Sequence, residues 1–188
     1  MSETVDQSGA RAKQDIVGRD KYNTTNNYAI KTPENIVEKL LQRLNTEIEK
    51  DEKSKETVDR LKRFYSQRAY DGVVGLKAKL EKSGRDGSYI DAIEMKEMFA
   101  KLLERWSLYP SAQQIFVYLL ARAERQFVDI ILPQAHELKI AQINTLMSDL
   151  IVEPTVQECG ASVFEVDHNT AMGMIYWLAE QCFIRWHR

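Results

Sequence analysis

A long periodic run of apolar residues places the strongest restriction on the fold. Residues 113–132 read QQIFVYLLARAERQFVDIIL, with apolar side chains recurring every three or four positions. Such spacing is typical of a helix that buries one face in a core. Pro110 precedes the run, where its fixed φ suits a first helical turn, and Pro133 follows it. The sequence therefore predicts a long buried helix over residues 111–132, with Phe116 and Phe127 in the core.

Similar apolar stripes predict further helices. Thr32-Pro33-Glu34 presents an N-cap residue, a proline and an acid in the order that opens a helix. Eight glycines and four prolines are few for 188 residues, and no strand-like alternation persists. The further helices are expected from Thr32 to Ile48, from Ser54 to Tyr65, over 73–82, from Ser88 through Leu103, over 136–152 with an end near Val152 before Pro154, and from an Asp167 cap to Gln181. The sequence predicts an all-α bundle of about six helices.

The first 31 residues differ from the rest of the chain because they are polar and lack helical periodicity. We expect an extended or disordered N-terminal arm over residues 1–31, followed by a helical interaction domain over residues 32–188. Within the arm, DIV and KYNTT contain residues that favour extended backbone, and such a segment can add a strand to a partner. The alternative is a disordered leader. The residues assigned to this hypothetical contact are Asp15, Ile16, Val17, Gly18, Arg19, Asp20, Lys21 and Tyr22.

The composition indicates a cytoplasmic protein. Two cysteines, Cys159 and Cys182, give no disulfide framework in a chain of this size. The opening residues MSETVDQSGARAKQ lack the apolar core of a secretory signal. The longest apolar stretches are too short to span a membrane, so we expect no membrane segment.

Few residues are candidates for catalysis. The sequence contains no glycine-rich phosphate loop, nucleophile elbow, zinc-protease motif or Cys-x-x-Cys pair. Glu165, Asp167 and His168 place two carboxylates near an imidazole, which is a possible acid–base set. The favoured alternative is a polar loop in which Asp167 caps the last helix. We therefore expect no catalytic residues and no cofactor.

A zinc site is also conceivable but not favoured. Cys159, His168, Cys182 and His187 offer four ligands of the right type, yet their spacing matches no compact zinc ligand pair. A buried Cys182 and a solvated His187 are the favoured interpretation. The sequence therefore predicts no metal site.

Residues 55–85 form a basic stretch, with nine Lys or Arg against four Asp or Glu. A helix with such charges could follow a phosphate backbone, and Arg60, Lys62 and Arg63 would make the contacts. Its acids lie at helical spacing from the basic residues, which favours an ordinary solvated face. Nucleic-acid binding is therefore the alternative function, and it is not the favoured one.

The C-terminal stretch GMIYWLAEQCFIRW is dense in aromatic residues. Tryptophan and tyrosine are common anchors of protein interfaces, although they also fill cores. A partner-binding surface is hypothesised at Tyr176, Trp177, Arg185 and Trp186, with burial in the core as the alternative.

Several segments resemble a known family. YDGVVGLKAKLEKSGR, AIEMKEMFAKLLERWSLYPSAQQIFVYLLARAERQFVDIILP and GMIYWLAEQCFIRWH are similar to the C-terminal domains of bacterial ABC-ATPase three-component conflict systems, of which Lamassu-type phage defence is a relative. QDIVGRDKYN resembles the Gly-Asp-x-Val-Gly-Gly-Asp-Lys stretch of many such proteins, with Arg19 in place of a glycine.

The resemblance implies an accessory subunit without catalytic activity. In such systems an SMC-like ABC ATPase, a small middle component and an effector act together. The resemblance therefore implies that this chain links the effector to the ATPase in an antiviral complex. Self-association through the N-terminal arm is a separate expectation.

Overall fold

Helices make up the fold in the computed structural model, which describes residues 35–54, 56–66 and 72–187. No strand occurs within those ranges, which confirms the predicted all-α bundle. None of the helices in these ranges has the length and apolar character needed to cross a membrane. The predicted arm, including Asp15 to Tyr22, lies outside the described residues.

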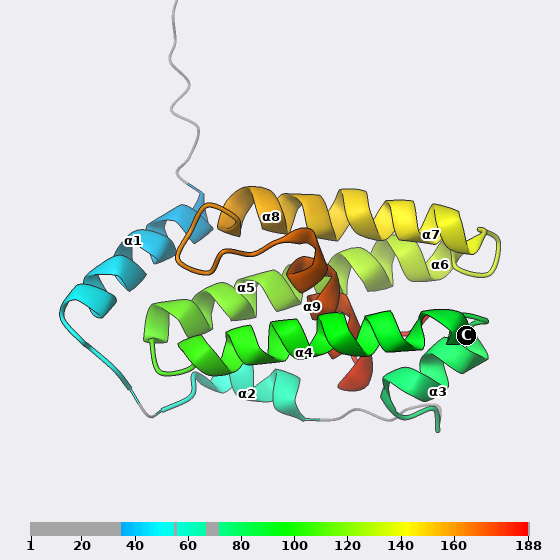
Figure 1. The fold of residues 1–188 in the computed structure, drawn as a ribbon, viewed down its shortest axis with the longest axis horizontal. Coiled ribbons are helices and arrows are strands. Elements are labelled where there is room, and N and C mark those ends of the chain that lie inside the picture. The colour runs from blue at the N-terminus through cyan, green and yellow to red at the C-terminus, as the bar shows by residue number, and fades with distance from the viewer. Residues whose placement is uncertain (1–34, 55, 67–71, 188) are drawn as a thin grey trace, which may run out of the picture. The chain divides into compact units, whose positions relative to one another are not determined.

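The described part of the chain contains seven continuous helical rods (Figure 1). Two of them contain a π-helical segment, Phe127–Ile131 between α5 and α6 and Ser148–Val152 between α7 and α8. The elements are α1 Ile36–Glu49, α2 Asp59–Tyr65, α3 Gly75–Lys82, α4 Tyr89–Trp106, α5 Pro110–Gln126, α6 Leu132–Gln134, α7 Ile140–Met147, α8 Glu153–Cys159 and α9 His168–Glu180.

Four of the described helices begin later than the sequence predicted: α3 begins at Gly75 instead of residue 73, α7 begins at Ile140 instead of residue 136, and α1 and α2 also begin late. The predicted cap residue Thr32 lies outside the described residues, and the N-cap of α1 is Asn35, whose side chain accepts a hydrogen bond from the Val37 amide at 3.1 Å. The second helix, α2, begins at Asp59 and not after Ser54. The segment before it stays non-helical because its backbone is held by α5, where buried Gln113 accepts from the Val58 amide and donates to the Glu56 carbonyl.

Both π-helical segments precede a proline by the same distance. Pro133 and Pro154 each follow two residues after a segment of widened turns. A proline inside a helix lacks an amide donor and crowds the carbonyl four residues before it, and a π-turn relieves both problems. The predicted helix end near Val152 is therefore wrong: the rod that begins at Ile140 passes through Pro154 and ends at Cys159.

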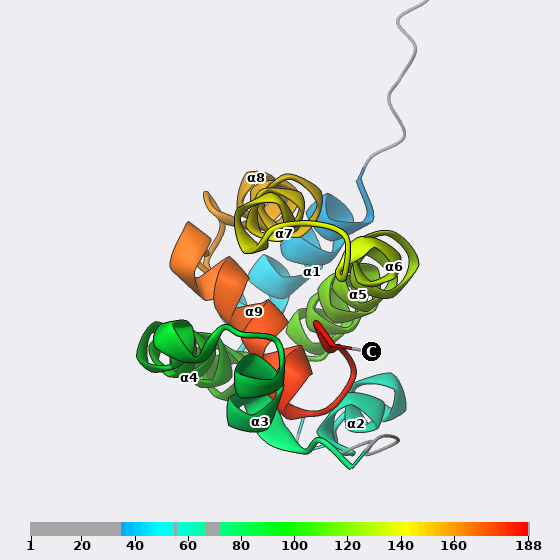
Figure 2. The same ribbon diagram turned by 90° about the vertical axis from the view of Figure 1, so that its right-hand side faces the viewer.

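The last helix, α9, lies in the middle of the bundle. The rods α4, α5–α6 and α7–α8 run side by side in Figure 1, and α9 crosses them. In Figure 2, α9 lies between α4 and α5. Gly173 permits the close crossing with α4, because a Cβ atom there would lie 2.0 Å from the Met95 carbonyl oxygen.

The core contains a cluster of aromatic rings. Phe116 and Phe127 are fully buried, which confirms their predicted place. Phe99 contacts Phe116 edge-on at 6.2 Å between ring centroids and Trp177 at 5.9 Å. These contacts join α4, α5 and α9 into one core.

Candidate docking surface

A groove of about 900 Å³ lies between α1, α2 and α5. Its apolar lining comes from Ile36, Leu40, Val58, Val117, Tyr118 and Ala121, and Gln114 is also part of it. Its charged lining consists of Lys39, Arg43, Arg60, Arg122 and Arg125. Among the described residues that line this groove, none is acidic. The groove therefore combines an apolar floor with a basic rim.

Helix packing leaves part of this apolar surface uncovered. Val37 and Leu44 of α1 are fully buried in the core. Ile36 directly precedes Val37 in the sequence but lies on another side of the helix, and 51% of its surface is exposed. An exposed apolar patch rimmed by polar groups is typical of a protein interaction site.

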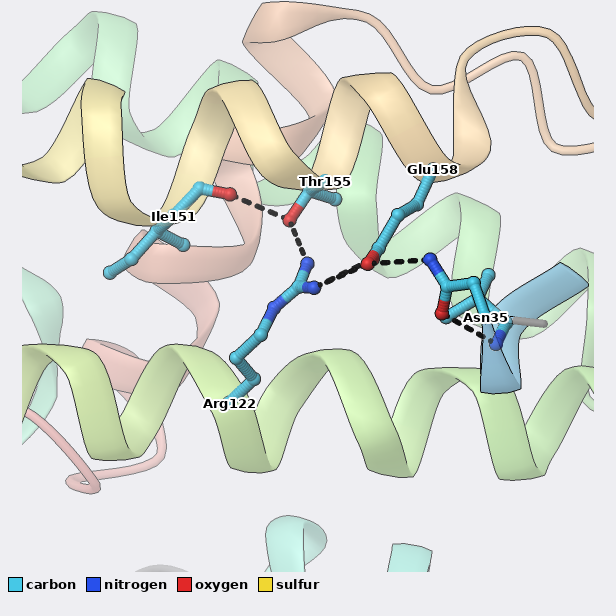
Figure 3. A network of polar contacts seen from close by, with 6 residues as sticks. Asn35, Arg122, Ile151, Thr155 and Glu158 are labelled. Carbon is cyan, nitrogen blue, oxygen red and sulfur yellow. Dashed lines mark hydrogen bonds and ion pairs between the residues drawn. The ribbon is translucent and has the colours of Figure 1, made fainter. Parts of the chain in front are cut away.

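A polar network holds the wall of the groove (Figure 3). Arg122 of α5 donates from Nη1 to both carboxylate oxygens of Glu158 in α8 at 2.7 Å, and from Nη2 to Thr155 at 3.3 Å. Asn35 donates to the same Glu158 carboxylate at 3.1 Å while it caps α1. The network thus fixes α1, α5 and α8 to one another.

The basic residues of the rim differ in how their charges are balanced. Arg122 is paired with Glu158, and Arg125 pairs with Asp129 at 3.2 Å. Within the described residues, Arg43 and Arg60 have no carboxylate partner, and both are exposed. The rim therefore carries uncompensated positive charge next to an apolar floor, which favours an acidic, partly apolar ligand.

The predicted C-terminal surface residues lie mainly in the core. Trp177 is 5% exposed and Trp186 is 4% exposed, so the alternative of burial describes both side chains. Trp177 contacts Tyr65 edge-on at 5.7 Å, and Trp186 contacts Phe127 at 5.7 Å. Tyr176 and Arg185 are partly exposed. Of the four residues assigned to this hypothetical surface, Tyr176 and Arg185 are the two whose side chains keep partial exposure.

Over residues 56–66 and 72–85, which the structure describes, the basic side chains do not form one continuous surface. Lys62 pairs with Asp59 at 2.8 Å, and Arg63 pairs with Glu124 at 2.8 Å while its guanidinium lies over the Phe64 ring. Lys79 is buried and donates to the Ala179 carbonyl. The proposed nucleic-acid residues therefore divide: Arg60 faces the groove, whereas the other two are paired with carboxylates.

The acid–base candidates have structural contacts in the described part of the chain. Asp167 accepts a hydrogen bond from the Thr170 amide at 2.7 Å and caps α9, as the favoured alternative predicted. This backbone hydrogen bond lowers the pKa of Asp167. His168 Nε2 lies 3.0 Å from Glu153, and this pair is exposed.

The four conceivable zinc ligands include two whose burial was predicted wrongly. Cys182 is partly exposed, because it follows the end of α9 in a left-handed conformation with φ of 63°. His187 is 7% exposed and so is buried, not solvated. Cys159 is fully buried, and desolvation raises the pKa of its thiol to about 12. Among the described residues, no three His, Cys, Asp or Glu side chains are grouped so that they could hold a metal ion.

Residues 75–186 match the family described as C-terminal domain 9 of the ABC-three component (ABC-3C) systems. The match spans more than half of the chain. The chain belongs to this ABC-3C family. Searches among curated proteins and among solved structures gave no match. Membership in the ABC-3C family makes the chain a component of a system with several parts, as the resemblance implied.

The ABC-3C match begins at the first residue of α3 and ends at Trp186. The groove is therefore built from both sides of this boundary: α5 lies within the match, and α1 and α2 precede it. The sequence did not reveal this groove, because its residues come from three distant helices. One signal was present, since Val117, Tyr118 and Ala121 widen the apolar face of α5 beyond what one core requires.

Proposed function

We propose that the chain is a non-catalytic adaptor subunit that joins an SMC-like ABC ATPase and an effector in a cytoplasmic anti-phage complex. The observation that carries the proposal is the ABC-3C match over residues 75–186. A domain of a multi-component system needs surfaces for its partners. The groove between α1, α2 and α5 supplies such a surface in the described part of the chain.

The groove fits a partner segment that combines apolar and acidic side chains. Ile36, Val117 and Ala121 offer apolar area, and each Å² covered contributes roughly 25 cal/mol before the costs of association. Arg43 and Arg60 at the rim would attract carboxylates, speed the encounter and reject basic segments. We therefore assign the groove to an amphipathic segment with Asp or Glu beside its apolar residues.

Nucleic-acid binding is the second candidate, and the unpaired charge of Arg60 is the observation that favours it. The apolar floor of the groove argues against it, since phosphate backbones bind to polar and basic surfaces. Replacing Arg60 with Gln should leave DNA retention on a gel shift unchanged if the adaptor role is correct. A salt-sensitive affinity for DNA that falls in Arg60→Gln would support this second candidate instead.

The adaptor role is tested by co-purification of the tagged chain with an SMC-like ABC ATPase and an effector of the same system. Ile36→Asp places a charge on the groove floor, in the first turn of α1, and should abolish or strongly reduce capture. Ile90→Asp is the matched control, because Ile90 is an exposed isoleucine in the first turn of α4. Equal capture by both variants would contradict the groove as the docking surface. Failure of the unaltered chain to capture either partner would contradict the adaptor role.

A further inference from the structure

A second, smaller pocket of about 220 Å³ lies away from the groove and contains a buried charge. Its lining includes Lys82 at the end of α3, Ser83 and Arg85 after that helix, Ile143 of α7, and Trp186 near the end of the chain. Arg85 is 6% exposed, so its guanidinium is removed from bulk water.

The guanidinium of Arg85 is only partly satisfied by its neighbours. Its Nη1 donates to Asn144 Oδ1 at 2.7 Å, and its Cζ lies 5.5 Å from the centre of the Trp186 ring. Its Nη2 is buried without an acceptor, and within the described residues no carboxylate pairs with this side chain. Burial lowers the pKa of Arg85.

A buried cation with no anionic partner is unusual in proteins. A guanidinium carries five donors and no acceptor, and it stays charged under all ordinary conditions. The contact with the Trp186 ring offsets part of the free-energy cost of removing the guanidinium from water. The amide oxygen of Asn144 accepts a hydrogen bond from one of the guanidinium nitrogens. The indole Nε1 of Trp186 is a second buried donor without an acceptor at the same pocket. Both donors need an oxygen that the described residues do not provide.

We propose that this pocket binds a small oxyanion, a phosphate or a carboxylate, between Arg85 and Trp186. Two oxygens of one anion would accept from Arg85 Nη2 and Trp186 Nε1, and the anion would neutralise the buried charge. Lys82 is exposed at the pocket and adds attraction for the anion. The site is independent of the proposed adaptor role, because it shares no residue with the groove.

The three tryptophans of the chain provide a local readout in the full-length protein. In ¹H–¹⁵N spectra, titration with sodium phosphate should shift the indole signal of Trp186 to saturation and leave that of Trp177 in place. Sodium chloride at matched ionic strength should not reproduce the shift. A parallel titration with sodium acetate identifies the source: saturation by acetate alone assigns a carboxylate, and saturation by phosphate alone assigns a phosphate group.

Three variants test the proposal directly. Arg85→Gln should abolish the saturable shift, and Lys82→Gln, at an exposed position that leaves the fold intact, should weaken the affinity several-fold. Arg60→Gln removes a cation elsewhere and should change nothing. The proposal is overturned if neither anion produces a saturable shift of the Trp186 signal, if the shift persists in Arg85→Gln, or if Lys82→Gln binds as tightly as the unaltered chain.

Discussion

Single atoms decide how closely the two central helices approach. The missing side chain of Gly173 is the condition for the crossing of α9 over α4, since the backbone of Met95 occupies the place of a Cβ atom. Gly173→Ala should therefore destabilise the fold by about 1–3 kcal/mol, the usual cost of overpacking a core. Chemical denaturation measures this difference. Gly87→Ala is the control, because a Cβ there meets nothing within 4 Å. Equal stability of the two variants would show that the helices separate without cost.

The two thiols should differ in reactivity. With a pKa of about 12, only about one Cys159 side chain in ten thousand is a thiolate at pH 8, and burial also blocks access. Cys182 is partly exposed. Titration of the native protein with a thiol reagent should give one fast equivalent, and denaturation should release the second. Cys182→Ser should remove the fast equivalent; a fast phase that persists in this variant would contradict the assignment.

The cap of α9 should show a defined pH dependence. Because the hydrogen bond from the Thr170 amide lowers the pKa of Asp167 below its ordinary value of 3.8, this carboxylate stabilises the fold above that pH, and the stabilisation disappears as the pH falls through the lowered value. Asp167→Ala should cost about 1 kcal/mol at neutral pH, and Asp167→Asn should cost less because asparagine also caps. Urea denaturation at neutral and acidic pH checks both statements. A cost for Asp167→Ala that is unchanged in acid would contradict the role of the charge.

The sequence predicted the middles of the helices more accurately than their ends. The apolar stripe of α5 predicted its burial, and Asp167 predicted the start of α9, because both signals are local. The helix end predicted from Pro154 was wrong, because the π-helical segment before this proline lets the helix continue through it. Packing against the rest of the fold stabilises the continued helix. Predictions from neighbouring residues alone do not include this stabilisation.

The pairing of helices through Arg122 and Glu158 was also beyond prediction, because the two residues lie on separate rods. The side chains are only 20% and 16% exposed, so loss of one partner leaves a poorly solvated charge. Glu158→Ala should destabilise the protein by about 1–3 kcal/mol. Glu153→Ala, on the same helix and paired with exposed His168, should cost about 0–1 kcal/mol. Thermal melts distinguish the two, and equal costs would contradict a structural role for the network.

The described part of the molecule contains residues 75–186, which match the ABC-3C family, and the helices α1 and α2, which precede them. The groove depends on that combination, since Arg43 and Arg60 reach it from α1 and α2. The sequence predicted a basic stretch but not this surface, because Glu124, the partner of Arg63, lies far away in the sequence and meets it only in the fold. The sequence also left open whether Trp177 and Trp186 lie in the core or at an interface, because tryptophan is common in both.

The two preceding helices should be required for a stable fold. Leu44 of α1 and both Leu61 and Phe64 of α2 are almost fully buried in the shared core. A shortened chain that begins at residue 72 should therefore bind a hydrophobic dye and lose its cooperative melt, because the covered face of α5 becomes exposed. A chain beginning at residue 32 should retain the melt. A cooperative transition of unchanged midpoint in the shorter chain would contradict this expectation.

The central place of α9 has a consequence for synthesis on the ribosome. The helix that fills the middle of the bundle is the last of the described helices to be translated, whereas its main neighbour, α4, is made much earlier. At roughly 5–20 residues per second, several seconds separate the two. During that interval the apolar faces of α3, α4 and α5 lack their partner, and nascent chains need shielding from one another. The core around α9 therefore closes late in synthesis.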